Sequence, residues 1–195
     1  MTGQRRNGRR TSLYGTLAAT ASLATVMAMA GTAGAEARHS PAPFATQAQA
    51  FGLSTGEART LQSRADTLLA EEGGTQIAAN KIRLKDGSVL VLALPGGHAA
   101  YGKDSNGRAL AQYPCDFGHF CAFSGTNFTG DVRDYFKCRE NPMPFTGRGS
   151  WENNQYTGTI ANFESSDHVS RWHDDGAYSE DKDADWTWVV WLRNC

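Results

Sequence analysis

The chain has 195 residues, and 19 basic residues nearly balance 20 acidic ones, for a net charge of −1. The basic residues are unevenly placed, because four arginines and no acid lie within the first ten residues. An uncharged run over residues 13–30 and a small-residue close at 33–35 follow, which predicts a secretory signal peptide over residues 1–35. Its removal leaves 15 basic against 20 acidic residues, a charge of −5 that argues against nucleic-acid binding and against docking on anionic lipid.

The composition favours strands and turns. Glycine accounts for 21 residues and aromatic side chains for 10%, which is more typical of a β-protein than of a helix bundle. An even number of cysteines in an exported chain predicts two disulfides, and zinc would need ligands at tighter, paired spacings. The spacing of the four cysteines leaves all three possible disulfide pairings open. The four cysteines lie in the second half of the chain: Cys115, Cys121, Cys138 and Cys195.

Residues 36–51 contain two prolines and few large apolar side chains, so we expect a flexible leader. A helix from about Thr55 to Glu72 follows, because Ser54 and Glu57 match a capping box and small apolar residues and leucines then recur every three or four positions. The glycine pair at 73–74 supplies the helix end.

A β-hairpin is predicted next, with strands at 81–85 and 89–94 and an Asp-Gly turn at 86–87. The helix and the hairpin together form a module over residues 52–97, whose core is too small to stand alone. We expect it to rest on the C-terminal domain or on another copy. The polar, glycine-containing stretch 98–112 is interpreted as a linker.

From residue 113 to the C-terminus, short aromatic segments alternate with turn residues at intervals near ten, the pattern of an all-β sandwich. No internal repeat is obvious in this part. The predicted strands are Phe120–Ser124, Gly130–Tyr135, Gly158–Glu164, His168–His173 and Trp186–Arg193.

The most specific motif is CDFGHFCAFSGTNFTG at 115–130. Two cysteines flank Gly118, and Phe123, Phe128 and Gly130 form an aromatic-x4-aromatic-x-Gly frame typical of a folded hairpin. The motif resembles the secreted bacterial metalloproteinase-inhibitor family with a βγ-crystallin-like fold, although Asp116 stands where that family often has proline. The resemblance implies a mainly β Greek-key sandwich at 113–195, behind the small α+β module, with disulfides Cys115–Cys121 and Cys138–Cys195.

The same resemblance implies a secreted inhibitor of extracellular peptidases, metallopeptidases first, that has no enzymatic activity and needs no cofactor. Pro142 and Pro144 should stiffen the loop 141–149, so Met143, Pro144 and Phe145 are the candidate inhibitory residues. The opposing interpretation is a strand connection in which Phe145 fills the core. The acidic loop 180–185 is a second candidate for contact with the peptidase.

The alternative function is a calcium-binding crystallin-type module without inhibitory activity. NNQYTG at 153–158 resembles a crystallin calcium half-site, with oxygen ligands from Asn153, Asn154 and Thr157. Asp181, Asp183 and Asp185 could form a looser clasp, although the spacing excludes an EF-hand. A polar turn and a solvated acidic loop are the simpler interpretations of the two segments.

Nothing in the sequence frames a catalytic nucleophile, and His168 and His173 lack the spacing of a zinc-protease helix. We interpret both histidines as surface residues and His119 as structural. The expected partner is an extracellular peptidase, with no nucleic acid and no membrane after signal cleavage, and the expected state is a monomer. A purely structural role, in which the 52–97 module contacts another envelope protein, is a third hypothesis.

Overall fold

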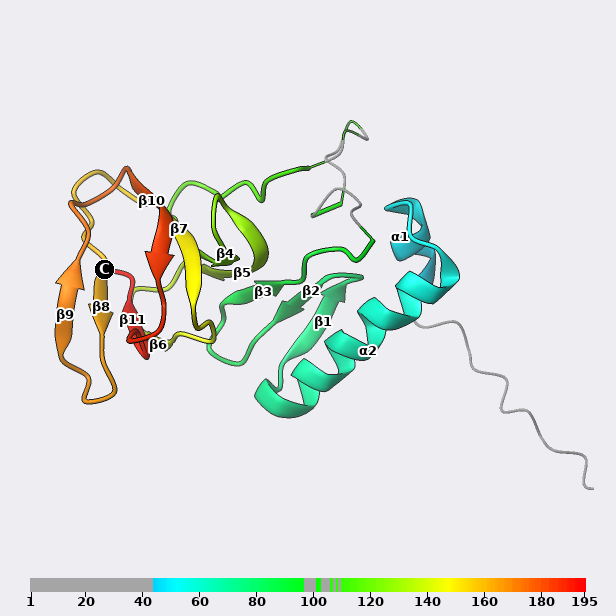
Figure 1. Ribbon diagram of the computed structural model, residues 1–195, viewed down its shortest axis with the longest axis horizontal. Helices are drawn as coiled ribbons and strands as arrows, with labels where there is room; N and C mark the ends of the chain where they lie inside the picture. The colour runs from blue at the N-terminus through cyan, green and yellow to red at the C-terminus, as the bar shows by residue number, and fades with distance from the viewer. Residues whose placement is uncertain (1–43, 97–100, 103–105, 107, 109) are drawn as a thin grey trace, which may run out of the picture. The chain divides into compact units, whose positions relative to one another are not determined.

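The computed structural model describes residues 44–96, 101–102, 106, 108 and 110–195 (Figure 1). The predicted signal peptide and the first part of the predicted leader lie outside these residues, as does part of the predicted linker. All described residues belong to one unit, His39–Cys195.

Helix α2 (Thr55–Glu72) forms where the capping pattern predicts it. The Ser54 hydroxyl accepts from the backbone N–H of Glu57, and the Glu57 carboxylate accepts from the backbone N–H of Ser54 at 2.8 Å. Both bonds satisfy donors that the first helical turn leaves free. Leu61 and Ala65 are the buried members of its apolar stripe.

A second helix, α1 (Ala45–Ala50), lies within the segment expected to be a flexible leader. The expectation of a flexible leader is wrong for residues 45–50, because the few apolar side chains in and beside this helix pack against the rest of the protein. Ala48 is buried in a cluster with α2 and the hairpin, and Phe44 and Phe51 pack against the same cluster. The Gln47 side chain also accepts a hydrogen bond from the backbone N–H of Ala79.

The larger sheet has seven antiparallel strands and combines the hairpin module with the C-terminal half of the chain. The predicted hairpin appears as two strands, and its second strand pairs with the C-terminal part through Val91 and Val132. The 52–97 module therefore extends the sheet of the β-domain. In spatial order the strands are β1 (Thr75–Ala78), β2 (Lys81–Arg83), β3 (Val89–Val91), β5 (Thr129–Tyr135), β4 (His119–Gly125), β7 (Arg148–Asn154) and β10 (Ser179–Asp185).

The smaller sheet has four antiparallel strands: β6 (Glu140–Pro142), β11 (Trp191–Arg193), β8 (Asn162–Glu164) and β9 (Ser170–His173). The predicted strand Trp186–Arg193 is correct only over its last three residues. Trp186 instead directly follows β10, and its indole N–H donates to the carbonyl of Phe123 at 2.9 Å inside the core. Strands β1, β6, β7 and β10 were not predicted.

The strand order contains a repeat that was not obvious in the sequence. β4 and β5 form a hairpin, β6 crosses to the smaller sheet, and β7 returns to pair with β4. In the next four strands, β8 and β9 form a hairpin, β10 crosses to the larger sheet, and β11 returns to pair with β8. Each sheet therefore holds one strand contributed by the other four-strand unit.

Two apolar clusters lie on the same face of the larger sheet. The four-stranded sheet covers one part, where Phe120, Trp151, Phe163 and Leu192 are buried together. The two helices cover the part formed by β2 and β3. A third cluster on the opposite face includes Tyr101, from the stretch expected to be a linker, whose hydroxyl donates to the carbonyl of Gly130 at 2.8 Å.

Both disulfides of the described chain have the predicted pairing. Cys115–Cys121 closes a short loop in front of β4, with a Cα–Cα distance of 5.9 Å. Cys138–Cys195 ties the last residue to the segment before β6, with a Cα–Cα distance of 5.3 Å. The described part of the chain is thus mainly β, with two antiparallel sheets, two helices and two disulfides. None of the described helices is both long and apolar enough to cross a bilayer.

Candidate functional site

The Cys115–Cys121 loop presents the first candidate site. Phe117 at its tip is 64% exposed, and its ring meets the ring of Tyr156 edge to face, with centroids 4.8 Å apart. Tyr156 is 69% exposed and Tyr178 is 60% exposed. Of the large hydrophobic side chains in the described residues, these three are the most exposed. The exposed pair formed by Phe117 and Tyr156 can bind an apolar pocket on a partner.

The loop is held rigidly by its neighbours. The backbone N–H of Gly118 donates to the carbonyl of Asn154 at 2.7 Å, and the Asn154 amide donates back to the carbonyl of Cys115 at 2.9 Å. Gly118 has a φ of 88°, a left-handed conformation that glycine adopts without strain. Ser179 pairs with Asn153 in the sheet, which brings the start of β10 to the same end of β7 as the loop.

A buried polar network supports the start of β4 just behind the loop. Asp134 binds His119 Nδ1 at 2.6 Å through one oxygen and accepts from the Tyr113 hydroxyl at 2.7 Å through the other. Burial and the charge of Asp134 raise the pKa of Tyr113 well above its usual range, so this hydroxyl stays protonated and remains a donor. The structural role expected for His119 agrees with these contacts.

The aromatic frame behind the loop forms a folded hairpin. The rings of Phe123 and Phe128 meet edge to face with centroids 5.4 Å apart. Asn127 and Phe128 both have positive φ, and a Cβ at Gly130 would collide with the hydroxyl of Ser124. Gly130 itself has a φ of 80°, so both its conformation and its surroundings exclude a side chain.

The loop 141–149 differs from the expected exposed inhibitory loop. Met143 is buried in the core between the sheets, and Phe145 packs against both the intersheet and the helix-covered clusters. Pro144 alone of the three candidate residues is exposed. The segment starts as strand β6, and the Tyr135 hydroxyl fixes it by donating to the carbonyl of Pro142 at 2.9 Å. The structure therefore corresponds to the core-filling interpretation.

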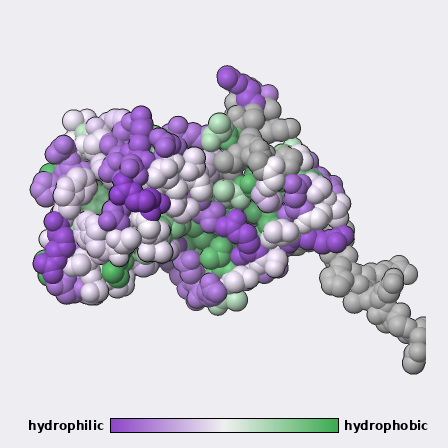
Figure 2. All heavy atoms as spheres, viewed as in Figure 1, coloured by the Kyte–Doolittle hydropathy of each residue, from purple (hydrophilic) through white to green (hydrophobic). Residues whose placement is uncertain are grey.

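The expected acidic loop 180–185 is instead part of strand β10, at the edge of the larger sheet. Figure 2 shows hydrophilic side chains gathered over this strand. An edge strand tolerates charged residues because its outer side faces solvent, and such charges discourage pairing with another chain. The alternation of Asp181, Asp183 and Asp185 is therefore typical of an edge strand.

The six calcium candidates lie in separate local environments, and their contacts do not bring them together around one cation. The Asn153 amide is buried and donates a hydrogen bond to Asp174 at 2.6 Å, and the Asn154 amide donates one to the carbonyl of Cys115. Asp183 forms an ion pair with Arg148. Asp181 accepts from the backbone N–H of Asp183, Asp185 accepts from the backbone N–H of Thr187, and Thr157 is exposed.

A hollow of about 210 Å³ opens beside these aspartates. Its lining is mainly indole rings with two carboxylates at the side, a combination that suits a flat or positively charged group. Sequence reasoning missed it because the contributing residues come from four separate segments. The lining residues are Trp151, Phe163, Trp172, Asp181, Ala184, Asp185, Trp186, Trp188 and Val189.

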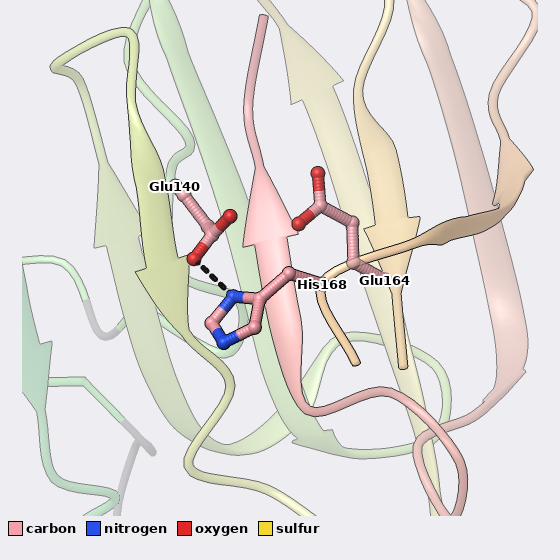
Figure 3. A group of neighbouring side chains, drawn as sticks. All are labelled: Glu140, Glu164 and His168. Atoms are coloured by element: carbon pink, nitrogen blue, oxygen red, sulfur yellow. Dashed lines mark hydrogen bonds and ion pairs between the residues drawn. The ribbon is translucent and has the colours of Figure 1, made fainter. Parts of the chain in front are cut away.

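A second group that sequence reasoning missed lies on the smaller sheet. Glu140, Glu164 and His168 each offer one ligand atom, and these atoms lie within 4.8 Å of one another (Figure 3). In the described residues this is the only group of three His, Cys, Asp or Glu side chains arranged in this way. The His168 ring binds the Glu140 carboxylate through Nδ1 at 2.7 Å. His168 is exposed, as predicted, but its neighbours come from distant strands that its sequence context could not reveal.

The chain was compared with protein-family models, with curated proteins and with solved structures, and none of the three comparisons gave a match.

Proposed function

We propose that this protein is a secreted inhibitor of extracellular peptidases, metallopeptidases first, and that the Cys115–Cys121 loop is its inhibitory element. The proposal rests on Phe117, an aromatic side chain that is 64% exposed at the tip of a loop closed by a disulfide. A loop that is already ordered loses little conformational entropy on binding, so more of the contact energy appears as affinity. A large exposed aromatic ring is also a common hot-spot residue in protein interfaces.

The strand order supports the βγ-crystallin-like part of the proposal. A Greek key places its fourth strand beside its first, as β7 lies beside β4 and β11 lies beside β8. In both four-strand units the third strand belongs to the opposite sheet. Two such units facing one another would form the sandwich that the sequence motif implies, and the helices with β1–β3 would be an addition to it.

The inhibitory role moves from loop 141–149 to the disulfide loop for a physical reason. To enter an enzyme cleft, Met143 would have to leave the hydrophobic core and the partly buried Phe145 would have to leave its packing against that core. Burial of a side chain of this size contributes roughly 2 kcal/mol to folding. Phe117 is exposed already, so its transfer into a pocket buries new apolar surface. Export through a signal peptide, disulfide formation outside the cytoplasm and action on extracellular enzymes are consistent parts of the same proposal.

Titration of active peptidases tests the proposal. The oxidised protein should reduce the activity of a thermolysin-type or a subtilisin-type enzyme with a stoichiometric end point. Phe117→Ala should weaken inhibition by about 2 kcal/mol, roughly 30-fold in the inhibition constant. The matched control is Ile77→Ala, which removes an exposed apolar side chain from β1 at the far edge of the larger sheet and should leave inhibition unchanged. Undiminished activity of both enzyme classes at excess protein would contradict the proposal.

A further inference from the structure

The β8–β9 hairpin shares the ring spacing of the folded β4–β5 hairpin, although most of its side chains differ and Ser170 stands where the first hairpin has Gly130. Residues 163–170 match the spacing of residues 123–130, with an aromatic ring at the first position and a second ring five residues later. The backbone conformation agrees at the second ring, where φ is 60° at His168 and 59° at Phe128. In the second hairpin Glu164 stands where the first has Ser124, and His168 stands where the first has Phe128. Two potential metal ligands thus replace a hydroxyl and an apolar ring.

Strand register brings these two side chains to a third ligand. Glu140 on β6 pairs with Arg193 on β11, and Glu164 on β8 pairs with Trp191, two residues earlier on the same strand. Alternate residues share a face, so both carboxylates and Arg193 lie on the same face of the smaller sheet. The hairpin folds over this face, and the His168 ring stacks on Trp191 with centroids 4.6 Å apart.

The hydrogen bonds at this site leave one buried oxygen without a partner. Arg193 binds Glu140 Oε2 through Nη2 and Glu164 Oε1 through Nε, both at 3.2 Å, which is long for a charge-assisted bond. Glu140 Oε1 faces His168 Nδ1. Glu164 Oε2 has no hydrogen-bond partner, although the residue is only 3% exposed. An unsatisfied buried carboxylate oxygen is costly, so this atom needs a further ligand.

We propose that Glu140, Glu164 and His168 bind one divalent transition-metal ion, with Zn²⁺ as the expected occupant. One imidazole nitrogen and two carboxylate oxygens are a donor set that suits zinc, whereas calcium takes oxygen ligands almost exclusively. Ligands of a tetrahedral zinc site lie about 3.4 Å apart for bond lengths of about 2.1 Å. The three ligand atoms already lie within 4.8 Å of one another, which is close to that spacing.

Exposure gives such a site one closed side and one open side. The side chain of Glu164 is 4% exposed, that of Glu140 is 25% exposed, and that of His168 is 52% exposed. Zinc would therefore bind the Glu164 carboxylate on the buried side of the site and keep one coordination position open to water. Three protein ligands with an open fourth position distinguish this arrangement from a closed structural zinc site.

The competing account is a site completed without a metal. The carboxyl groups of Glu140 and Glu164 could share one proton, with Arg193 and His168 as partners. The two accounts differ in what happens when Arg193 is removed. Its guanidinium repels a bound cation, so Arg193→Met should tighten zinc binding if the metal account holds. If the network is purely structural, the same change only destabilises the fold.

Calorimetric titration of the oxidised, untagged full chain with ZnCl₂ tests the proposal, and a thermal melt with zinc or with EDTA provides a second readout. We expect one Zn²⁺ per chain. Glu164→Gln and His168→Gln each remove a direct ligand, so each should weaken binding by at least the roughly 10- to 100-fold typical of losing an outer-shell partner. His168→Gln alters an exposed side chain, so it remains informative even if Glu164→Gln folds poorly. The matched control, His173→Gln, removes an imidazole of β9 outside the cluster and should leave zinc affinity unchanged.

Three results would overturn the proposal: no zinc binding, zinc binding that both variants leave unchanged, or an Arg193→Met protein that melts at a lower temperature without any gain in zinc affinity. Peptidase inhibition is a separate measurement, so the zinc site and the inhibitory loop can fail independently of one another.

Discussion

Arg133 in the larger sheet donates through Nη1 to the Glu72 carboxylate in the last turn of α2, at a distance of 2.7 Å. The second guanidinium nitrogen donates to Asp86 in the hairpin turn at 2.7 Å. Arg133 is 1% exposed, and it lies on the face of the sheet between the part that the helices cover and the part that the smaller sheet covers. This one side chain therefore joins the helix, the hairpin and the β-domain.

Arg133→Met should destabilise the protein by about 3 kcal/mol, because it leaves two carboxylates without their buried counter-charge. Urea unfolding of the two proteins measures the difference. Arg64→Met is the matched control, since it breaks an exposed ion pair with Asp131 and should cost less than about 1 kcal/mol. Equal losses in the two variants would contradict a special role for Arg133.

The contribution of Asp86 should depend on pH. Burial by itself would raise the pKa of Asp86, but hydrogen bonds from Ser88 and the charge of Arg133 outweigh burial and lower it. A lowered pKa stabilises the folded state above the unfolded value of about 3.9, and this stabilisation disappears as the pH falls through the folded value.

Urea unfolding of the wild-type protein and of Asp86→Asn between pH 3 and pH 7 tests this. The wild-type protein should be the more stable of the two at neutral pH, and the gap should narrow below about pH 4. A gap of constant size across this range would contradict the assignment.

The two disulfides should differ in their effect on stability. Cys138–Cys195 joins residues 57 positions apart, and its loss should cost about 4 kcal/mol on chain-entropy grounds. Cys115–Cys121 joins residues six positions apart and should cost about 2 kcal/mol. Paired Cys→Ala variants, compared by denaturant unfolding, measure both values.

The short disulfide should matter more for inhibition than for folding. Its loss frees the loop that carries Phe117, so we expect weaker inhibition by a protein that still unfolds cooperatively. Full inhibition after removal of Cys115–Cys121 would show that the loop needs no covalent closure.

Gly149 on β7 should not tolerate a side chain. A methyl group there would collide with the Trp186 indole and with the carbonyl oxygen of Phe123, the two groups joined by a core hydrogen bond. Gly149→Ala should cost about 1–3 kcal/mol through overpacking. Gly56→Ala is the matched control, because its site in the first turn of α2 is open and alanine favours a helix. Thermal melting separates a lower midpoint for the first variant from an unchanged or higher one for the second.

Local patterns predicted the local elements well. The capping box at Ser54 and Glu57 located α2, and the Asp-Gly turn located the hairpin between β2 and β3. The aromatic frame at 123–130 located β4 and β5. In each case the signal lies within a few residues and depends on backbone geometry that neighbouring side chains determine.

Strands stabilised only by distant partners were missed. β7 contains arginine, glutamate and asparagine, and β10 alternates acidic residues, so neither has a typical strand composition. They form because β7 inserts between β4 and β10, which supplies backbone hydrogen bonds on both sides of it. Strand preference depends on such neighbours more than on the residue itself.

The sequence by itself predicted the signal peptide, the disulfides, helix α2, the β2–β3 hairpin and the folded aromatic frame. Tertiary structure decided the rest. It packed Met143 and Phe145 into the core, left Phe117 exposed, and turned the acidic segment into an edge strand. It also brought Glu140 and Glu164 to His168 across a strand, because register in a sheet brings together residues far apart in the chain.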